Sequence, residues 1–171
     1  MAAEVRELHV VFGSGPVGRA VAAELVRDGR RVRVVNRSGR VVGLDDVEVA
    51  QGDASDPAFA RAVAAGATVV YQALNPGYRN WPELFPPLQA GVLAGAEAAG
   101  ARLVAMENMY MYGPAGGRPL TEELPYAATT RKGRTRARMA RTCSRRTARG
   151  GSRCPSGERP TFSGRTSWTP R

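Results

Sequence analysis

Three glycines near the start of the chain have the spacing G-x-G-x-x-G. The first permits a tight turn, the second lets the backbone approach a ligand closely, and the third permits close packing between a helix and a strand. Because the free N–H groups at a helix N-terminus attract anions, this pattern predicts a loop that binds the diphosphate of a dinucleotide. The expected contacts are Gly13, Ser14, Gly15, Pro16, Val17 and Gly18.

A second set of candidate cofactor contacts follows the next apolar run, at Asn36, Arg37 and Ser38. An NAD-binding enzyme usually carries an acidic residue at this point, which binds the ribose 2′-hydroxyl. Since no acid here would repel a 2′-phosphate, Arg37 can pair with one while Asn36 and Ser38 donate hydrogen bonds. NADP is therefore the expected cofactor, with NAD and a solvent-exposed Arg37 as the alternative. Further contacts are expected after two later apolar runs, from Asp53, Ala54, Ala73, Leu74 and Asn75.

The elements that must position these residues alternate between short apolar runs and helical patterns. The apolar runs predict strands over 8–12, 32–35, 47–50, 67–73 and 102–106. The patterns between them predict helices over 16–28, 57–65 and 83–99. This alternation predicts an α/β fold with a doubly wound parallel sheet, the Rossmann fold, in which ligands bind at the carboxyl ends of the strands.

The net charge of +10 is concentrated toward the C-terminus. Residues 1–130 hold 12 arginines and 14 acidic residues, whereas residues 131–171 hold 13 basic residues and one acid. We therefore expect an NAD(P)-binding domain over 1–130 and a basic, disordered tail over 131–171. The sequence contains no apolar run long enough to span a membrane and no signal peptide, so the expected location is cytoplasmic. Cys143 and Cys154 fit no metal-binding spacing, and no metal site is expected.

The tail contains no valine, leucine or isoleucine, and three explanations for it compete. It could be a disordered arm that binds nucleic acid, an extension without function, or the product of a displaced reading frame. Back-translation in the neighbouring frame from residue 141 gives a helical Leu-Leu-Ala-Ala run, followed by the alternation Val-x-Val-x-Ile of a sixth strand. This order favours the frame shift and makes nucleic-acid binding the weaker explanation. The C-terminal part of the fold is then expected to be missing or disordered.

Over residues 8–140 the chain resembles the NAD-dependent epimerase/dehydratase family, a branch of the extended and atypical short-chain dehydrogenases/reductases. The resemblance is carried by four segments, at 11–29, 36–38, 52–56 and 106–114. It implies hydride transfer between a nicotinamide and a carbonyl or sugar carbon of a small-molecule substrate. It also implies a tyrosine that acts as general acid and base, a lysine that lowers its pKa, and a serine or threonine that holds the substrate oxygen.

The sequence departs from this catalytic pattern at each position. Asn108 stands where serine or threonine is expected, and Lys132 follows the candidate tyrosine, Tyr126, after six residues instead of four. The resemblance therefore implies an NADP-dependent oxidoreductase or epimerase with Tyr126, Asn108 and Lys132 as candidate catalytic residues. The altered spacing leaves open a non-catalytic module that binds or senses NADP(H). Further substrate contacts are expected from Glu107, Tyr110 and Tyr112.

Overall fold

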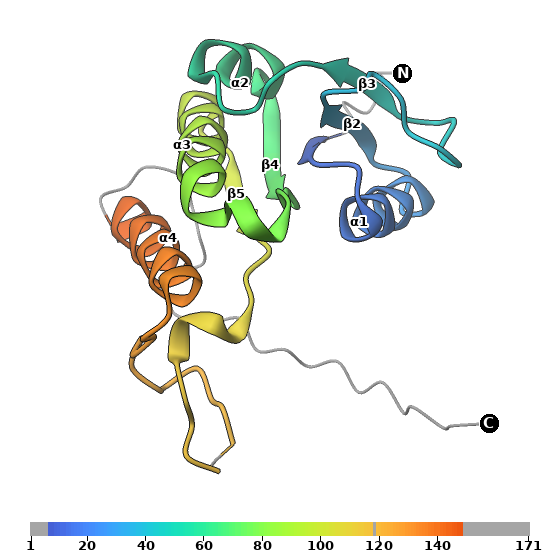
Figure 1. Cartoon of the computed structure of the whole chain (residues 1–171). Helices are drawn as coiled ribbons and strands as arrows, with labels where there is room; N and C mark the ends of the chain where they lie inside the picture. Colours follow the sequence, from blue (N-terminus) through green and yellow to red (C-terminus); the bar gives the residue numbers. More distant parts are fainter. Residues whose placement is uncertain (1–6, 118, 149–171) are drawn as a thin grey trace, which may run out of the picture.

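The structure, a computed structural model, describes residues 7–117 and 119–148 (Figure 1). In these residues five parallel strands form one sheet in the order β3-β2-β1-β4-β5. The predicted doubly wound parallel sheet is thereby confirmed. The strands are β1 Leu8–Phe12, β2 Arg31–Asn36, β3 Glu48–Gln51, β4 Ala67–Gln72 and β5 Arg102–Ala105.

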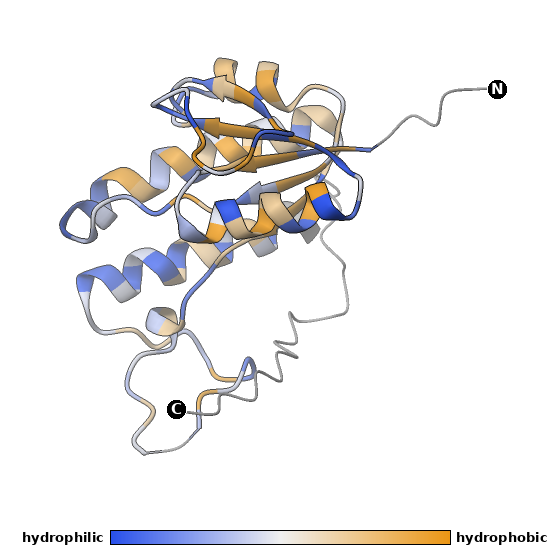
Figure 2. Cartoon of the chain, turned by 90° about the vertical axis from the view of Figure 1, so that its right-hand side faces the viewer, coloured by the Kyte–Doolittle hydropathy of each residue, from blue (hydrophilic) through white to orange (hydrophobic). Residues whose placement is uncertain are grey.

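Helices cover both faces of the sheet, with α1 on one side and α2 and α3 on the other (Figure 1). Alternate residues of β1 supply the two cores: Val11 packs with α1, whereas Val10 and Phe12 pack with α2 and α3. All five residues of the central strand β1 are buried, as a parallel strand that is covered on both faces requires, and much of the sheet is hydrophobic (Figure 2). The helices are α1 Pro16–Arg27, α2 Pro57–Ala64, α3 Trp81–Ala99 and α4 Arg131–Ala148, with short 3₁₀ segments η1 Tyr78–Asn80 and η2 Met109–Tyr112.

The strand order changes direction beside β1, because β2 and β3 extend the sheet one way and β4 and β5 the other. The carboxyl ends of β1 and β4 therefore flank the point at which the topology switches. In open α/β sheets this point leaves a crevice in which ligands bind. Among residues 7–117 and 119–148, no helix has the length and apolar character needed to cross a bilayer.

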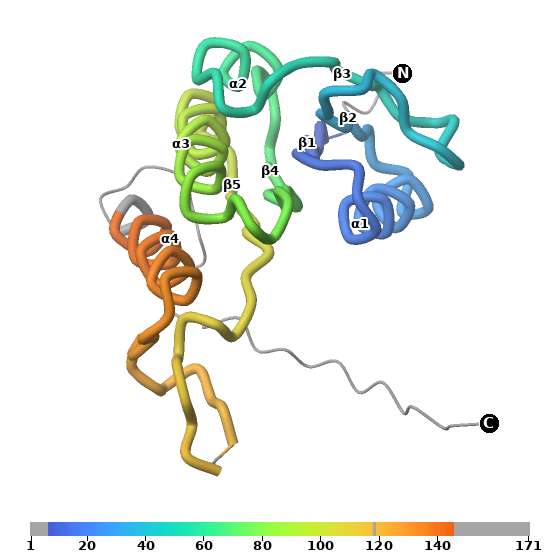
Figure 3. Tube along the Cα trace, in the orientation of Figure 1, coloured from blue at the N-terminus to red at the C-terminus, as the bar shows by residue number. Residues whose placement is uncertain are grey.

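The structure differs from the sequence-based expectation at residues 131–148, which form α4 and not a disordered segment. In the trace of the chain, α4 lies beside α3 (Figure 3). Met139 packs in a cluster with Trp81 and Phe85 of α3, and Ala137 and Ala140 are buried as well. Small side chains and one methionine at helical spacing are thus enough to bury one face of a basic helix. Residues 149–171, which include Cys154 and the rest of the predicted basic tail, lie outside the described residues.

Candidate functional site

The turn from β1 into α1 requires glycine at two positions, Gly13 and Gly18. Gly13 has a φ of 109°, and a Cβ there would lie 2.8 Å from the carbonyl oxygen of Ala73, which follows β4. A Cβ on Gly18 would overlap the carbonyl oxygen of Gly13. Gly15 differs, because a Cβ there would meet no atom within 4 Å. The first and third glycines therefore hold the loop against β4 and α1, and the second leaves open space beside the backbone.

The start of α1 leaves this open space lined by backbone donors. Gly15 is the N-cap residue and offers no side-chain cap, Pro16 occupies the first turn, and no acidic residue lies in that turn. The first N–H groups of a helix have no partner within the helix, and they carry partial positive charge. The loop thus has the chemistry of an anion seat, and the residues fit a dinucleotide diphosphate.

Asn36, at the end of β2, ties its own loop to the glycine loop. Its amide nitrogen donates to the hydroxyl oxygen of Ser14 at 3.0 Å and to the carbonyl oxygen of Arg40 at 2.8 Å. Its amide oxygen accepts from the backbone of Gly39 at 2.8 Å and from the hydroxyl of Ser38 at 3.2 Å. Both ends of the Asn36 amide are therefore engaged within the fold.

Arg37 is exposed and lies near Asp53, the residue that follows Gly52 after β3. One carboxylate oxygen of Asp53 accepts from the backbone and the hydroxyl of Ser55, both at 2.8 Å. These hydrogen bonds, with the charge of Arg37, hold the pKa of Asp53 below its ordinary value. Arg37 and Asp53 thus present a cation and an anion at the rim of the crevice. Ala54, another predicted contact, has its side chain buried in the core.

The residues that follow β4 reach the same crevice. The Ala73 amide donates to the carbonyl oxygen of Phe12 at 2.9 Å, which brings the chain after β4 against the end of β1. Leu74 is half-buried and packs on the core, whereas Asn75 is exposed. Of the predicted cofactor contacts, the structure therefore brings together the glycine loop, the segment 36–38 and Ala73.

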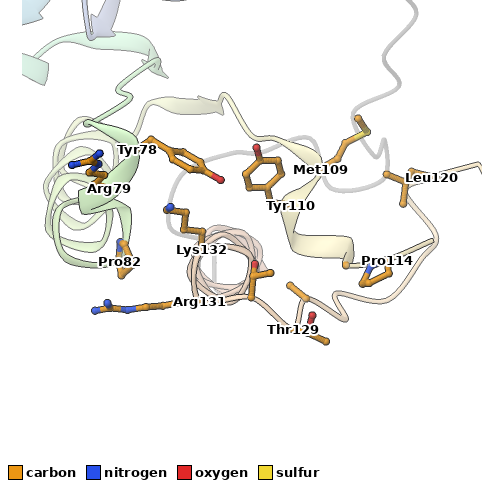
Figure 4. Close-up of a pocket in the computed structure, with 13 residues that line it drawn as sticks. Tyr78, Arg79, Pro82, Met109, Tyr110, Pro114, Leu120, Thr129, Arg131 and Lys132 are labelled. Atoms are coloured by element: carbon orange, nitrogen blue, oxygen red, sulfur yellow. The ribbon is translucent and has the colours of Figure 1, made fainter. Parts of the chain in front are cut away.

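A cavity of about 780 Å³ lies beyond the carboxyl ends of β4 and β5, between η1, η2 and the start of α4 (Figure 4). Two of the predicted site residues, Tyr110 and Lys132, line it. Its lining includes the basic residues Arg79, Arg131 and Lys132 and no acidic residue, within the described part of the chain. The walls of this cavity carry positive charge.

Lys132 meets two tyrosines in this cavity. Its ammonium nitrogen lies 3.6 Å from the centroid of the Tyr78 ring, a cation–π contact. The rings of Tyr78 and Tyr110 lie edge to face with centroids 6.4 Å apart. The neighbouring Tyr78 raises the pKa of Tyr110, whereas the charge of Lys132 lowers it. Sequence reasoning missed Tyr78, although its position shortly after a buried strand was a signal.

Tyr126 lies in a different place from Lys132. Its ring packs edge to face with Tyr112 at 5.5 Å, and it lines a second cavity of about 420 Å³. Burial is the largest cause that raises the pKa of Tyr126, followed by the charges of Tyr112 and Glu107. The other residues of the second cavity include three arginines of α4: Arg134, Arg138 and Arg141. The structure thus does not bring the predicted tyrosine and lysine into one cavity.

Asn108 and Glu107, the other predicted site residues, both hold local structure. The Asn108 side-chain oxygen accepts from the backbone of Tyr110 at 3.1 Å and so caps η2. Glu107 is half-buried, with a carboxylate oxygen 2.9 Å from a guanidinium nitrogen of Arg136 in α4. Burial is the largest influence on the pKa of Glu107 and raises it, while the Arg136 charge opposes the shift.

Comparisons with known proteins agree with this arrangement. The model of a family described as NAD(P)H-binding matches residues 13–142. A UDP-galactose 4-epimerase structure is 28% identical, with a TM-score of 0.74, and the match covers 86% of this chain and 54% of that one. No curated protein matches the chain.

Two other similar structures show the fold. The structure of MoeE5 in complex with UDP-glucose and NAD is 22% identical, with a TM-score of 0.70, covering 85% of this chain and 50% of that one. A short-chain dehydrogenase/reductase superfamily protein from Agrobacterium tumefaciens with bound NAD is 23% identical, with a TM-score of 0.68. The match covers 85% of this chain and 47% of that one. The chain therefore spans about half the length of these structures. With the glycine loop at the switch point of the sheet and a family match over most of its length, this chain belongs to the NAD(P)H-binding family, and its resemblance to NAD-dependent epimerases/dehydratases is confirmed.

Proposed function

We propose that this protein binds NADP(H) against the loop Gly13–Gly18 and transfers hydride between the nicotinamide and a carbonyl or sugar carbon. The observation that carries this proposal is the open space beside Gly15, where an added Cβ would meet no atom within 4 Å. This space adjoins the unpaired N–H groups at the start of α1. A diphosphate fits such a space because the donors are fixed and no acid lies in the first turn.

The end of β2 supports NADP(H) over NAD(H). The Asn36 amide is fully used within the fold, so it offers no free acceptor to a ribose 2′-hydroxyl. Arg37 is the exposed cation at this point and can pair with a 2′-phosphate. Asp53, with its lowered pKa, stays charged and can accept a hydrogen bond from the adenine amino group.

The positive walls of the larger cavity support an anionic substrate. Arg79, Arg131 and Lys132 line it, and the ion pair between Arg131 and Glu83 at 2.6 Å leaves the other two cations without such a partner in the described residues. The size of the cavity, about 780 Å³, is typical of a small-molecule site. We propose a phosphorylated carbonyl compound or a nucleotide sugar as the substrate class, the latter being the class named for the MoeE5 complex.

A second candidate function is a non-catalytic module that binds NADP(H). The observation that favours it is the separation of Tyr126 from Lys132, which line different cavities. In this alternative the chain binds the cofactor and converts no substrate.

Calorimetry with NADPH and with NADH tests the cofactor, and a panel of aldehydes, ketones and nucleotide sugars tests the reaction. We expect tighter binding of NADPH than of NADH, and conversion of at least one member of the panel. Binding without any conversion supports the non-catalytic alternative. Failure of the folded protein to bind either cofactor refutes the whole proposal.

A further inference from the structure

The smaller cavity, of about 420 Å³, is lined by three cations of one helix face. Arg134, Arg138 and Arg141 of α4 line it together with Tyr126 and Ala128, and its lining includes no acidic residue of the described chain. Their spacing of four and three residues places the arginines side by side on α4. All three are exposed, and none takes part in an ion pair between described residues. Their charges are therefore not neutralised within this part of the fold.

Two of these arginines are fixed by the chain that forms the opposite wall. The Arg134 guanidinium donates to the carbonyl oxygen of Thr129. The Arg141 guanidinium donates to the carbonyl oxygen of Tyr126 at 3.1 Å and lies 5.6 Å from the ring of that tyrosine. A neutral carbonyl oxygen engages one N–H of a guanidinium and leaves its charge and its other donors unused. The two side chains are thus held in place with most of their binding capacity open.

Arg138 lies between them along α4. Its guanidinium has no hydrogen-bond or ion-pair partner among residues 7–117 and 119–148. The charge of Glu107 acts on Tyr126, but the ion-pair partner of Glu107 is Arg136, which lies outside the lining of this cavity. Because like charges three and four residues apart destabilise a helix, the free protein carries a repulsion that a bound anion would relieve.

We propose that the smaller cavity binds the phosphate or diphosphate group of a small molecule, at a site separate from the cofactor seat. The proposal goes beyond the proposed hydride transfer and does not depend on it. The planar fork of a guanidinium matches the oxygens of a phosphate, and three such forks converge on this cavity. Burial is the largest cause that raises the pKa of Tyr126, so its hydroxyl stays protonated through neutral pH and can donate to a phosphate oxygen.

The dimensions of the site favour a small ligand over a nucleic-acid strand or a membrane. Arg134 and Arg141 are seven residues apart, which is about 10 Å along a helix and leaves room for one or two phosphate groups. The cavity volume of about 420 Å³ lies in the range of small-molecule sites. The exposed large apolar side chains of the described chain all lie outside α4, so α4 lacks the apolar face with which a helix enters a bilayer surface.

The site also adjoins the larger cavity. Ala128 lines both cavities, and Thr129, whose carbonyl oxygen holds Arg134, lines the larger one. A ligand in the smaller cavity would therefore contact the segment that forms a wall of the larger cavity.

The first experiment observes the arginine side chains directly by NMR. In ¹⁵N-labelled protein, the Nε–H signals are assigned by their loss in Arg134→Gln, Arg138→Gln and Arg141→Gln. Inorganic phosphate and pyrophosphate are then titrated against chloride at constant ionic strength, so that screening does not change. We expect these three signals to move with one dissociation constant, whereas Arg145, an exposed arginine of α4 outside the lining, does not respond. Equal movement of all exposed arginines, or no movement of the three, overturns the inference.

The second experiment uses Arg138→Gln, because the Arg138 guanidinium holds no part of the described fold. We expect its pyrophosphate affinity, read from the Arg134 signal, to fall roughly tenfold or more. Its Tm in phosphate-free buffer should equal or exceed that of the wild type, since a repulsion is removed. Arg145→Gln is the matched control and should keep the wild-type affinity. Unchanged pyrophosphate affinity in Arg138→Gln overturns the inference.

Two other ligands separate this site from its alternatives. If NADPH moves the same three signals and displaces pyrophosphate, the arginines belong to the cofactor site and the inference fails. If a single-stranded oligonucleotide binds more tightly than pyrophosphate and also moves the Arg145 signal, the helix binds a nucleic-acid strand and the small-molecule assignment is wrong. A protein that binds pyrophosphate here and does not bind NADPH refutes the proposed function and leaves this inference intact.

Discussion

The substitution Gly15→Ala separates the stability of the glycine loop from its function. Gly15 has φ −68° and ψ −177°, which any residue adopts, and an added Cβ would meet no atom within 4 Å. The folded protein therefore accommodates alanine without strain. The Cβ would fill the space that we assign to the diphosphate, so the substitution should weaken the cofactor complex alone.

The expected magnitudes have opposite signs. Replacing a glycine at a compatible position stabilises a protein by about 0.4–1 kcal/mol, because the unfolded chain loses conformational freedom. This gain corresponds to a rise of roughly 1–4 °C in Tm for a domain of this size. A diphosphate that is pushed away loses charge-assisted hydrogen bonds worth about 1.5–3 kcal/mol. The NADPH dissociation constant should then increase roughly 10- to 150-fold.

Thermal unfolding of the free protein and calorimetric titration with NADPH measure the two effects on the same sample. Gly18→Ala is the matched control, because its Cβ would overlap the Gly13 carbonyl oxygen and should lower both stability and affinity. If Gly15→Ala binds NADPH as tightly as the wild type, no diphosphate lies against Gly15 and the reasoning fails. If it lowers Tm by several degrees, the space beside Gly15 is filled in the free protein.

Three further predictions concern other parts of the chain. Arg37→Ala should weaken NADPH by about 1–3 kcal/mol and NADH by much less, since only the former carries a 2′-phosphate; equal losses in calorimetry would count against this role. Burial raises the pKa of Glu107, so the folded state holds its proton more tightly than the unfolded state. This group therefore subtracts stability as pH rises from the ordinary glutamate pKa through the raised one, and urea unfolding should show that slope in the wild type and a weaker slope in Glu107→Gln. Asp56 accepts from the Ala58 backbone at 2.8 Å and caps α2, so Asp56→Ala should cost about 0.5–2 kcal/mol of unfolding free energy with unchanged NADPH affinity.

Much of the cofactor half could be predicted from the sequence because its determinants are local. The glycine spacing reports a steric requirement of one loop, and the alternation of apolar runs reports burial on both faces of a sheet. The Asp56–Pro57 pair likewise marks the start of α2, with Asp56 as the N-cap and Pro57 as the first helical residue. Each of these signals lies inside a single segment and needs no knowledge of what packs against it.

The larger cavity could not be predicted in the same way, because its lining residues come from several elements. The contact between Tyr78 and Lys132 joins residues that are far apart in the sequence. It forms because α4 packs on α3. The position of α4 depends in turn on the packing of Met139 against Trp81 and Phe85. After Leu124 the sequence contains few large apolar side chains, and its composition does not show which small residues share a helix face. The packing of α4 could therefore not be predicted.

The two halves of the proposed site are linked through the chain that leaves β4. Ala73 contacts the glycine loop, and Tyr78 follows it five residues later, beside Tyr110 and Lys132. Because an extended chain spans at most about 3.3–3.6 Å per residue, Tyr78 lies within roughly 18 Å of Ala73. One dinucleotide seated on the glycine loop can therefore extend toward the cavity of the two tyrosines. This short segment thus joins the phosphate seat to the larger cavity, which supports the proposal that the substrate binds in that cavity.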